Sequence, residues 1–193
     1  MDVKLAINKR RAYRALKPFK ITVKIIQELS KAAQLAPSCF NKQPWRYVFI
    51  SDKKCLNDFR VALPDANNWA YDASLIIAVI SEASLDCKLK DGREYYLFDT
   101  GIASGFMILR ATELGLVAHP MAGYDAQKAK ELLNIPTNMT LINIIAVSQH
   151  AENYKDFLTK EKIESEENRP PRMNLSEFIY INKYGISFNE KKF

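Results

Sequence analysis

The chain has 193 residues, of which 48% are hydrophobic and 26% are charged, with a formal net charge of +6. This composition is that of an ordinary soluble globular protein, and the length suits one domain with a substantial core. No run reaches the roughly 18 apolar residues of a membrane-spanning helix, and the N-terminus lacks the apolar stretch of a secretory signal.

The cysteines and lysines narrow the class of protein further. Cys39, Cys55 and Cys87 form no CxxC pair and would leave one odd thiol in any disulfide scheme. A reduced, cytoplasmic protein is therefore the simplest expectation. The lysines are scattered and accompany no recognisable nucleic-acid-binding motif, so we expect neither a nucleic-acid partner nor a membrane.

An arginine cluster follows an amphipathic N-terminal stretch. Arg10, Arg11 and Arg14 fall within five residues. Such a run is either a solvated charge cluster or a set of planar guanidinium groups that bind phosphate in a bidentate way. Tyr13 and Leu16 add apolar anchors, which favours arginines held against the folded body and facing an anionic partner.

A stiff polar loop comes next in the chain. We expect a helix over residues 21–36, capped by Thr22, and a strand over residues 45–50. Between them, Pro37 and Pro44 fix φ near both ends of the Pro37–Trp45 loop. Its hydroxyl, thiol and carboxamide groups either satisfy local backbone or read the edge of a flat, hydrogen-bonding ring.

The middle of the chain alternates strands and helices. A short polar helix precedes an apolar run over residues 75–80, typical of a strand covered on both faces. Residues 82–93 form a polar loop or lid. The pattern over residues 95–114 predicts a long helix that is apolar nearly all round, so it is buried in a core or an interface. Gly101 and Gly105 on this helix let another backbone approach closely.

The last third holds two elements and a charged segment. After a short strand, Asp125 is expected to cap a helix over residues 126–133, and residues 141–147 predict another buried strand. Residues 149–168 are charged and poor in apolar residues, which favours an extended or mobile surface segment. Residues 175–184 resume an apolar pattern that suits docking, including on a partner subunit. The order of elements indicates an α/β or α+β sandwich.

Few side chains are available for direct catalysis. His119 and His150 are the only histidines, and no Cys/His spacing matches a zinc site, so we expect no metal. Serine-hydrolase, P-loop and dinucleotide-binding glycine motifs are absent. Cys39 is a nucleophile, a packed thiol or a ligand-lining group. Such a chain can borrow its chemistry from a bound cofactor.

Two motifs carry a resemblance to a known family. The run Arg10-Arg11-Ala12-Tyr13-Arg14, followed by Ala36-Pro37-Ser38-Cys39-Phe40-Asn41-Lys42-Gln43-Pro44-Trp45, closely resembles the FMN-dependent nitroreductase family. Further matches in the same order are Asp99-x-Gly101, Leu114-Gly115-Leu116, Gly123-Tyr124-Asp125, Leu132-Leu133-Asn134-Ile135-Pro136 and Arg172. The resemblance implies an α+β fold, a central mixed β-sheet flanked by helices. It also implies one FMN-binding domain over residues 1–193, whose C-terminal arm, residues 151–193, is exchanged in a homodimer with FMN at the interface.

The resemblance also assigns roles to single residues. It implies that Arg10 and Arg172 bind the FMN phosphate, with Arg11 and Arg169 beside them. Arg14 would lie near flavin N1 and the C2 carbonyl, where negative charge builds on reduction. The remaining residues with an implied cofactor contact are Pro37, Ser38, Cys39, Asn41, Gln43, Ala122 and Gly123. Ala122 and Gly123 would approach flavin N5, and no side chain would act as an essential acid or base.

The function that follows from the resemblance is a two-step flavin reaction. NADH or NADPH would reduce FMN, and a nitroaromatic or quinone-like acceptor would then reoxidise it at the same site. The alternatives are another flavin reaction, such as dehydrogenation or reductive dehalogenation, and an FMN-storing or sensing protein without turnover. Ala12 stands where the family often has a hydroxyl, and Cys39 replaces a small residue beside the ring. The physiological acceptor, the choice of nicotinamide and a lid role for residues 82–93 stay open.

Overall fold

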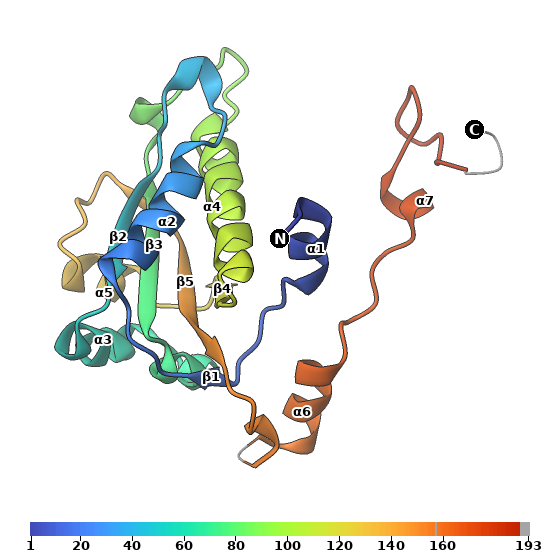
Figure 1. The fold of residues 1–193 in the computed structure, drawn as a ribbon. Helices are drawn as coiled ribbons and strands as arrows, with labels where there is room; N and C mark the ends of the chain where they lie inside the picture. Colours follow the sequence, from blue (N-terminus) through green and yellow to red (C-terminus); the bar gives the residue numbers. More distant parts are fainter. Residues whose placement is uncertain (157, 190–193) are drawn as a thin grey trace. The chain divides into compact units, whose positions relative to one another are not determined.

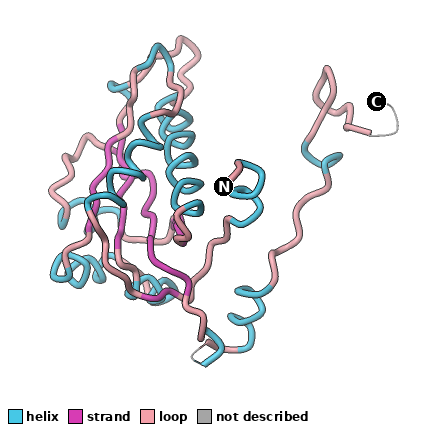
Figure 2. Tube along the Cα trace, in the orientation of Figure 1, coloured by secondary structure: helices cyan, strands magenta, loops and turns pink. Residues whose placement is uncertain are grey.

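The computed structural model of the chain describes residues 1–156 and 158–189, and these divide into two compact units at residues 157 and 158. The first unit contains the whole sheet and five of the α-helices, and the second contains two short helices (Figures 1 and 2). Within the described residues, no helix combines the length and hydropathy needed to cross a membrane.

The sheet is built around its longest strand. Strand β5 (Thr140–His150) pairs with β3 (Leu75–Ser81), β4 (Val117–Met121) and the short β1 (Leu16–Lys17), and β3 also pairs with β2 (Arg46–Ile50). The α+β fold and the helix-flanked central sheet are confirmed. The sheet was expected to be mixed, yet every pairing between described strands is antiparallel.

Alternate side chains of β3 enter two different halves of the core. Leu75, Ile77 and Val79 pack with residues of the helices α2 and α4. Ile76, Ala78 and Ile80 belong to the other cluster, which contains Phe59 and residues near α3 and α5. Because successive side chains of a strand point to opposite faces, a strand buried throughout must be covered on both sides. The prediction of a doubly covered strand over residues 75–80 is confirmed.

The helices of the first unit begin and end close to the predicted positions. They are α1 (Val3–Lys9), α2 (Val23–Gln34), α3 (Lys53–Phe59), α4 (Tyr95–Glu113) and α5 (Ala126–Leu132), with shorter 3₁₀ segments at Cys39–Asn41, Arg60–Ala62, Asp65–Asp72, Ala83–Leu85 and Tyr154–Asp156. Thr22 and Asp125 accept hydrogen bonds from the backbone of Ile25 and Lys128, as N-caps do. Gly115 follows α4 with φ of 77°, the left-handed conformation of a helix-terminating glycine.

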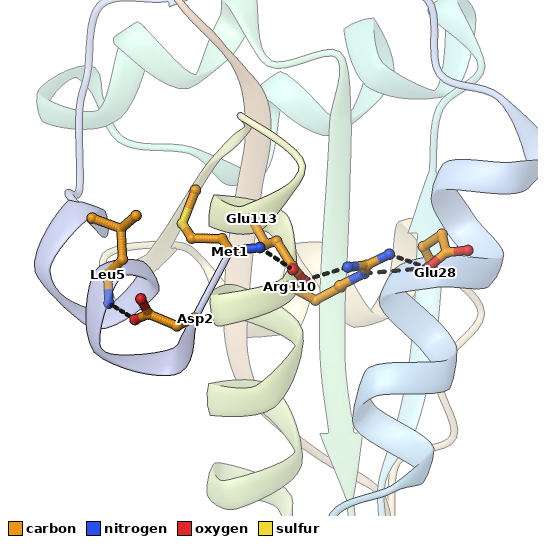
Figure 3. Close-up of polar contacts among 6 residues, drawn as sticks. All are labelled: Met1, Asp2, Leu5, Glu28, Arg110 and Glu113. Carbon is orange, nitrogen blue, oxygen red and sulfur yellow. Dashed lines mark hydrogen bonds and ion pairs between the residues drawn. The ribbon is translucent and has the colours of Figure 1, made fainter.

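A charged clamp ties α4 to α2 and to the N-terminus (Figure 3). The Arg110 guanidinium on α4 donates to Glu28 of α2 at 2.5 Å and also pairs with Glu113. Glu113 in turn accepts a hydrogen bond from the amino group of Met1 at 3.1 Å. Arg110 lowers the pKa of both carboxyl groups, first through hydrogen bonds and then through its charge. The clamp therefore links three chain segments that are far apart in sequence.

The segment over residues 149–168 differs from its prediction. Strand β5 continues to His150, and α6 (Lys160–Glu167) is helical, so the expectation of an extended segment is wrong there. Glu and Lys are good helix formers, and they can support a helix that has almost no apolar face. Residue 157 of the predicted segment lies outside the described residues.

The second unit exposes several large apolar side chains. It contains α6, α7 (Leu175–Phe178) and a bridge between Tyr180 and Ser187. A capping box formed by Asn174 and Glu177 starts α7. Its exposed apolar side chains are Met173, Leu175, Phe178, Tyr184 and Ile186. Exchange of this arm in a dimer stays a prediction.

Candidate cofactor site

The Pro37–Trp45 loop has an unusual backbone. Phe40, Asn41 and Gln43 have φ values of 47°, 57° and 50°, all in the left-handed region that residues with a Cβ rarely adopt. Each such residue costs on the order of 1 kcal/mol or more, and such strain persists where surrounding contacts hold it. Strained loops of this kind are concentrated at ligand-binding sites. This favours the interpretation that the polar groups of the loop bind the edge of a flat ring.

Several contacts hold the loop in this conformation. The Ser38 hydroxyl accepts a hydrogen bond from the Gln43 backbone N–H at 3.0 Å, and the Gln43 side chain donates to the Asn41 carboxamide oxygen at 3.1 Å. The Ser81 hydroxyl donates to the Pro44 carbonyl at 2.9 Å. Gln43 therefore supports the loop from within, while the Asn41 side chain is exposed at its surface.

The buried side chain of Asp99 anchors the Pro37–Trp45 loop to α4. Asp99 on α4 is 2% exposed, and its Oδ2 accepts a hydrogen bond from the Cys39 backbone N–H at 2.7 Å. The motif Asp99-x-Gly101 belonged to the resemblance, but Asp99 was not assigned to the site. An acidic residue near the start of a largely apolar helix is a signal of this role, because a buried polar group needs a partner.

The cysteines do not follow the sequence expectation. Cys39 forms a disulfide with Cys87, with 6.1 Å between their Cα atoms, and Cys55 alone is a free, exposed thiol. The expectation of three reduced thiols is wrong for this pair. The two residues are 48 positions apart, so only the fold could bring them together. The disulfide joins residues 82–93 to the Pro37–Trp45 loop.

One group in the described part of the chain has the atom types of a metal site. Cys39, Cys87 and Asp86 offer two sulfurs and one carboxylate oxygen that lie within 4.8 Å of one another. In the oxidised pair both sulfurs are bonded to each other, which leaves a single carboxylate as ligand. The expectation of no metal stays a prediction.

The arginine segment, residues 10–14, is held against the fold by Tyr13. Tyr13 packs against the core cluster that contains Phe59, and its ring stacks on His150 at 4.0 Å. Arg11 lies over the Tyr13 ring at 5.2 Å from its centroid. Arg10 and Arg11 are half-buried, whereas Arg14 is exposed. The prediction that apolar anchors hold this segment to the body is confirmed.

A chain of contacts connects the arginine segment to Gly123. The Tyr13 carbonyl lies 3.0 Å from His119 Nδ1, and the His119 ring stacks on Trp69 at 4.4 Å. Trp69 Nε1 donates to Asn67 Oδ1 at 3.2 Å, and Asn67 Nδ2 donates to the Gly123 carbonyl at 2.6 Å. Residues 67 and 69 were missed by the sequence analysis, because nothing in their local pattern distinguishes them from a turn.

A side chain at position 123 would displace the Asn67 side chain. An added Cβ would lie 2.9 Å from Asn67 Nδ2, closer than real Cβ contacts. Ala122 and Gly123 are exposed immediately after the buried Met121, which ends β4. A backbone without a Cβ can approach a flat ring closely, so the exposed Ala122–Gly123 segment fits the role that the resemblance implies.

The two halves of the predicted site are far apart within the chain. The loop leads into Arg46, which pairs with Ile80 at the end of β3 that faces Leu141. The arginine segment leads into Leu16, which pairs with His150. From Leu141 to His150, β5 spans roughly 30 Å at the usual strand rise. Figure 1 shows the loop beyond one end of the sheet and the arginine segment near the other.

The predicted residues therefore form two groups. Arg10, Arg11 and Arg14 precede the strand that pairs with His150, and Pro37, Ser38, Cys39, Asn41 and Gln43 lie in the loop at the other end of the sheet. Ala122 and Gly123 follow Met121, which pairs with Ile144 between these two ends, and Asn67 connects Gly123 to the Trp69–His119–Tyr13 contacts. Arg169 and Arg172 belong to the second unit, and their phosphate contacts stay a prediction.

Comparison with known proteins gives one consistent answer. The family model described as "Nitroreductase family" matches residues 7–147. The chain is 26% identical to Protein DrgA of Synechocystis, covering 95% of this chain and 97% of the relative. It is 23% identical to an NADH dehydrogenase of Thermus thermophilus, covering 79% and 88%. A solved oxidoreductase containing FMN superposes with a TM-score of 0.81 at 26% identity, covering 95% and 93%.

Proposed function

Because the chain belongs to the nitroreductase family, we propose that it is an FMN-dependent oxidoreductase that uses NADH or NADPH to reduce nitroaromatic or quinone-like acceptors. The likeness to an FMN-containing oxidoreductase and to an NADH dehydrogenase supports the cofactor and the hydride donor. When bound, FMN supplies the chemistry by accepting a hydride and passing it to the acceptor.

One observation supports a site that is shared between two subunits. The loop and the arginine segment lie at opposite ends of the sheet, so one FMN cannot contact both groups of a single chain. Two copies related by a two-fold axis would bring the loop of one chain to the arginine segment of the other, twice. We therefore place the cofactor between two subunits.

An apolar face supports this dimer. Phe98 and Phe106 of α4, and Leu114 directly after it, are 58%, 41% and 37% exposed, whereas the sequence predicts that this helix is buried in a core or an interface. A cavity of about 490 Å³ beside Phe106 is lined by residues of α1, α2 and α4 and is largely apolar. A partner subunit would cover this face, and exposed apolar patches commonly mark such contacts.

The protein's residues would bind and orient rather than transfer protons. Arg10 and Arg11 present planar forks that suit the phosphate, and the strained loop presents the Asn41 carboxamide toward the ring. Arg14 would stabilise the negative charge that develops at N1 and the C2 carbonyl. The donor set therefore fits FMN, and the nicotinamide and the acceptor would use the same open face in turn.

An anaerobic titration tests this function. The purified protein should be yellow, or should become yellow with FMN, and NADH or NADPH should bleach the flavin absorbance. Adding a quinone should then restore the colour. A protein that binds no FMN contradicts the whole proposal, whereas bound FMN that neither nicotinamide bleaches contradicts the enzymatic part.

Arg14 gives a second, finer prediction. Arg14→Ala should lower the reduction potential of bound FMN, because a charge-assisted hydrogen bond of about 1.5–3 kcal/mol is lost. For a two-electron couple this corresponds to roughly 30–65 mV. The matched control is Arg60→Ala, which removes an arginine that packs on the Tyr71 ring. Equal potentials in the wild type and Arg14→Ala would refute the role of Arg14.

A further inference from the structure

The disulfide between Cys39 and Cys87 is accompanied by a buried carboxyl group, that of Asp86. Asp86 is only 6% exposed, and its Oδ1 accepts a hydrogen bond from the Cys87 backbone N–H at 2.7 Å. Its Oδ2 is buried and has no hydrogen-bond partner in the structure. A carboxylate oxygen of Asp86 and the two sulfurs lie within 4.8 Å of one another.

A buried carboxyl group with one unpaired oxygen is costly in its charged form. Burial raises the pKa of Asp86, and the neighbouring Asp99 raises it further, whereas the Cys87 N–H and Lys42 act in the opposite direction. These groups come from the Asp86 segment itself, from α4 and from the Pro37–Trp45 loop. Protonation would relieve the cost of burying this charge, and the proton would then lie beside the disulfide.

Cys39 and Cys87 are only half-buried residues, whereas the neighbouring Asp86 is buried. The pair is therefore less enclosed than the carboxyl group, and an incoming thiol would approach it from its exposed side. A purely structural disulfide needs no acid beside it. In a disulfide that opens and closes, the sulfur that leaves is a thiolate, and a neighbouring acid can protonate it.

From this arrangement we infer that Cys39 and Cys87 form a redox-active pair that exchanges with a dithiol, with Asp86 as its proton donor and acceptor. A thiolate of the dithiol attacks one sulfur, a mixed disulfide forms, and the Cys39–Cys87 bond breaks. The released thiolate takes the Asp86 proton. Asp86 then accepts the proton of the second thiol as that thiol attacks the mixed disulfide, and the other cysteine leaves and is protonated from solvent. Two electrons and two protons pass from the dithiol to the pair.

Reduction of the disulfide would remove the covalent link between residues 82–93 and the Pro37–Trp45 loop. In the reduced pair, the Cys39 backbone N–H keeps its hydrogen bond to Asp99, so the Pro37–Trp45 loop stays anchored to α4. Residues 82–93 lose their covalent attachment to that loop. Reduction therefore releases the 82–93 segment specifically. This inference does not depend on FMN binding or turnover.

The first test counts thiols. Protein in the Cys55→Ser background, purified in air and denatured, should have no free thiol before reduction and two after it. Dithiothreitol and reduced thioredoxin serve as probes of a small and a protein dithiol, and reduction of the folded protein by either one supports the pair. Failure of both would overturn the inference. Two free thiols in the air-purified protein, with stoichiometric zinc that Asp86→Asn abolishes, would also overturn it and assign the group to a metal.

The second test isolates Asp86. Asp86→Asn keeps an oxygen for the Cys87 N–H but cannot give up a proton, so reduction by dithiothreitol should slow about tenfold or more. Rates normalised to thiolate concentration should fall with rising pH in the wild type and stay flat in Asp86→Asn. Asp91→Asn, an exposed carboxyl group paired with Arg93 in the same segment, is the matched control. Equal pH profiles in the wild type and Asp86→Asn would remove Asp86 from the exchange.

A third measurement follows the segment. Hydrogen exchange in residues 82–93 should increase when the pair is reduced or when Cys87→Ser is introduced, while exchange in residues 37–45 changes little. Unchanged exchange in residues 82–93 would contradict the release of this segment.

Discussion

Gly123 shows how one missing side chain can connect the fold to the cofactor site. Its carbonyl accepts a hydrogen bond from Asn67 Nδ2 at 2.6 Å, and Asn67 Oδ1 accepts one from Trp69 Nε1. Asn67 therefore occupies the space that a Cβ at position 123 would need. The sequence motif Gly123-Tyr124-Asp125 indicates a functional glycine. Only the fold shows that the Asn67 side chain would clash with a larger residue at position 123.

Gly123→Ala should destabilise the protein by about 1–2 kcal/mol, because Asn67 must move and lose its hydrogen bonds. In an Asn67→Ala background the same substitution should cost much less, so the two effects should not add. Urea denaturation of the wild type, the two single variants and the double variant gives the coupling free energy between the two positions. Additive effects of the two substitutions would contradict the contact.

At the scale of elements, the clamp around Arg110 links α2, α4 and the N-terminus (Figure 3). The pKa values of Glu28 and Glu113 are lowered from their ordinary value of 4.5. A carboxyl group with a lowered folded-state pKa stabilises the fold above its unfolded pKa. That contribution is lost as the pH falls through the folded value.

Arg110→Gln should therefore lower the melting temperature at pH 7, and the difference from the wild type should shrink below about pH 4. Thermal unfolding followed by circular dichroism between pH 3 and pH 7 gives both curves. Arg93→Gln, which breaks an exposed pair with Asp91, is the control and should have a small effect at every pH. A difference for Arg110→Gln that stays constant with pH would rule out the ionic clamp.

Most elements of the first unit could be predicted from local signals. Thr22, Asp125 and Gly115 mark helix ends through side-chain or backbone chemistry that acts within a few residues, and the apolar run over residues 75–80 reports its burial directly. Helix α6 was missed because its residues show helix propensity without an apolar face.

Contacts between distant residues could not be predicted. Nothing local relates Cys39 to Cys87 or Asp99 to the loop backbone, since both contacts depend on how α4 and residues 82–93 pack. The candidate site residues followed from the resemblance, and their division into two distant groups appears only in the antiparallel register of β5.

At the scale of the whole molecule, this division is the central feature. An exposed apolar face on α4 lies in the same chain as two half-sites that cannot meet. The two-fold dimer that we propose would account for both observations, because it would cover the face and complete two FMN sites at once.

Mixing two complementary variants tests this account most directly. One variant carries Arg10→Ala and Arg14→Ala, and the other carries Ser38→Ala and Asn41→Ala. Each should bind FMN poorly alone, because both of its sites are damaged. After the subunits are exchanged, half of the dimers should be mixed, and each should regain one intact site. Equilibrium dialysis should therefore find about a quarter of the sites with wild-type affinity for FMN. A mixture that binds no more FMN than its separate components would contradict a site shared between subunits.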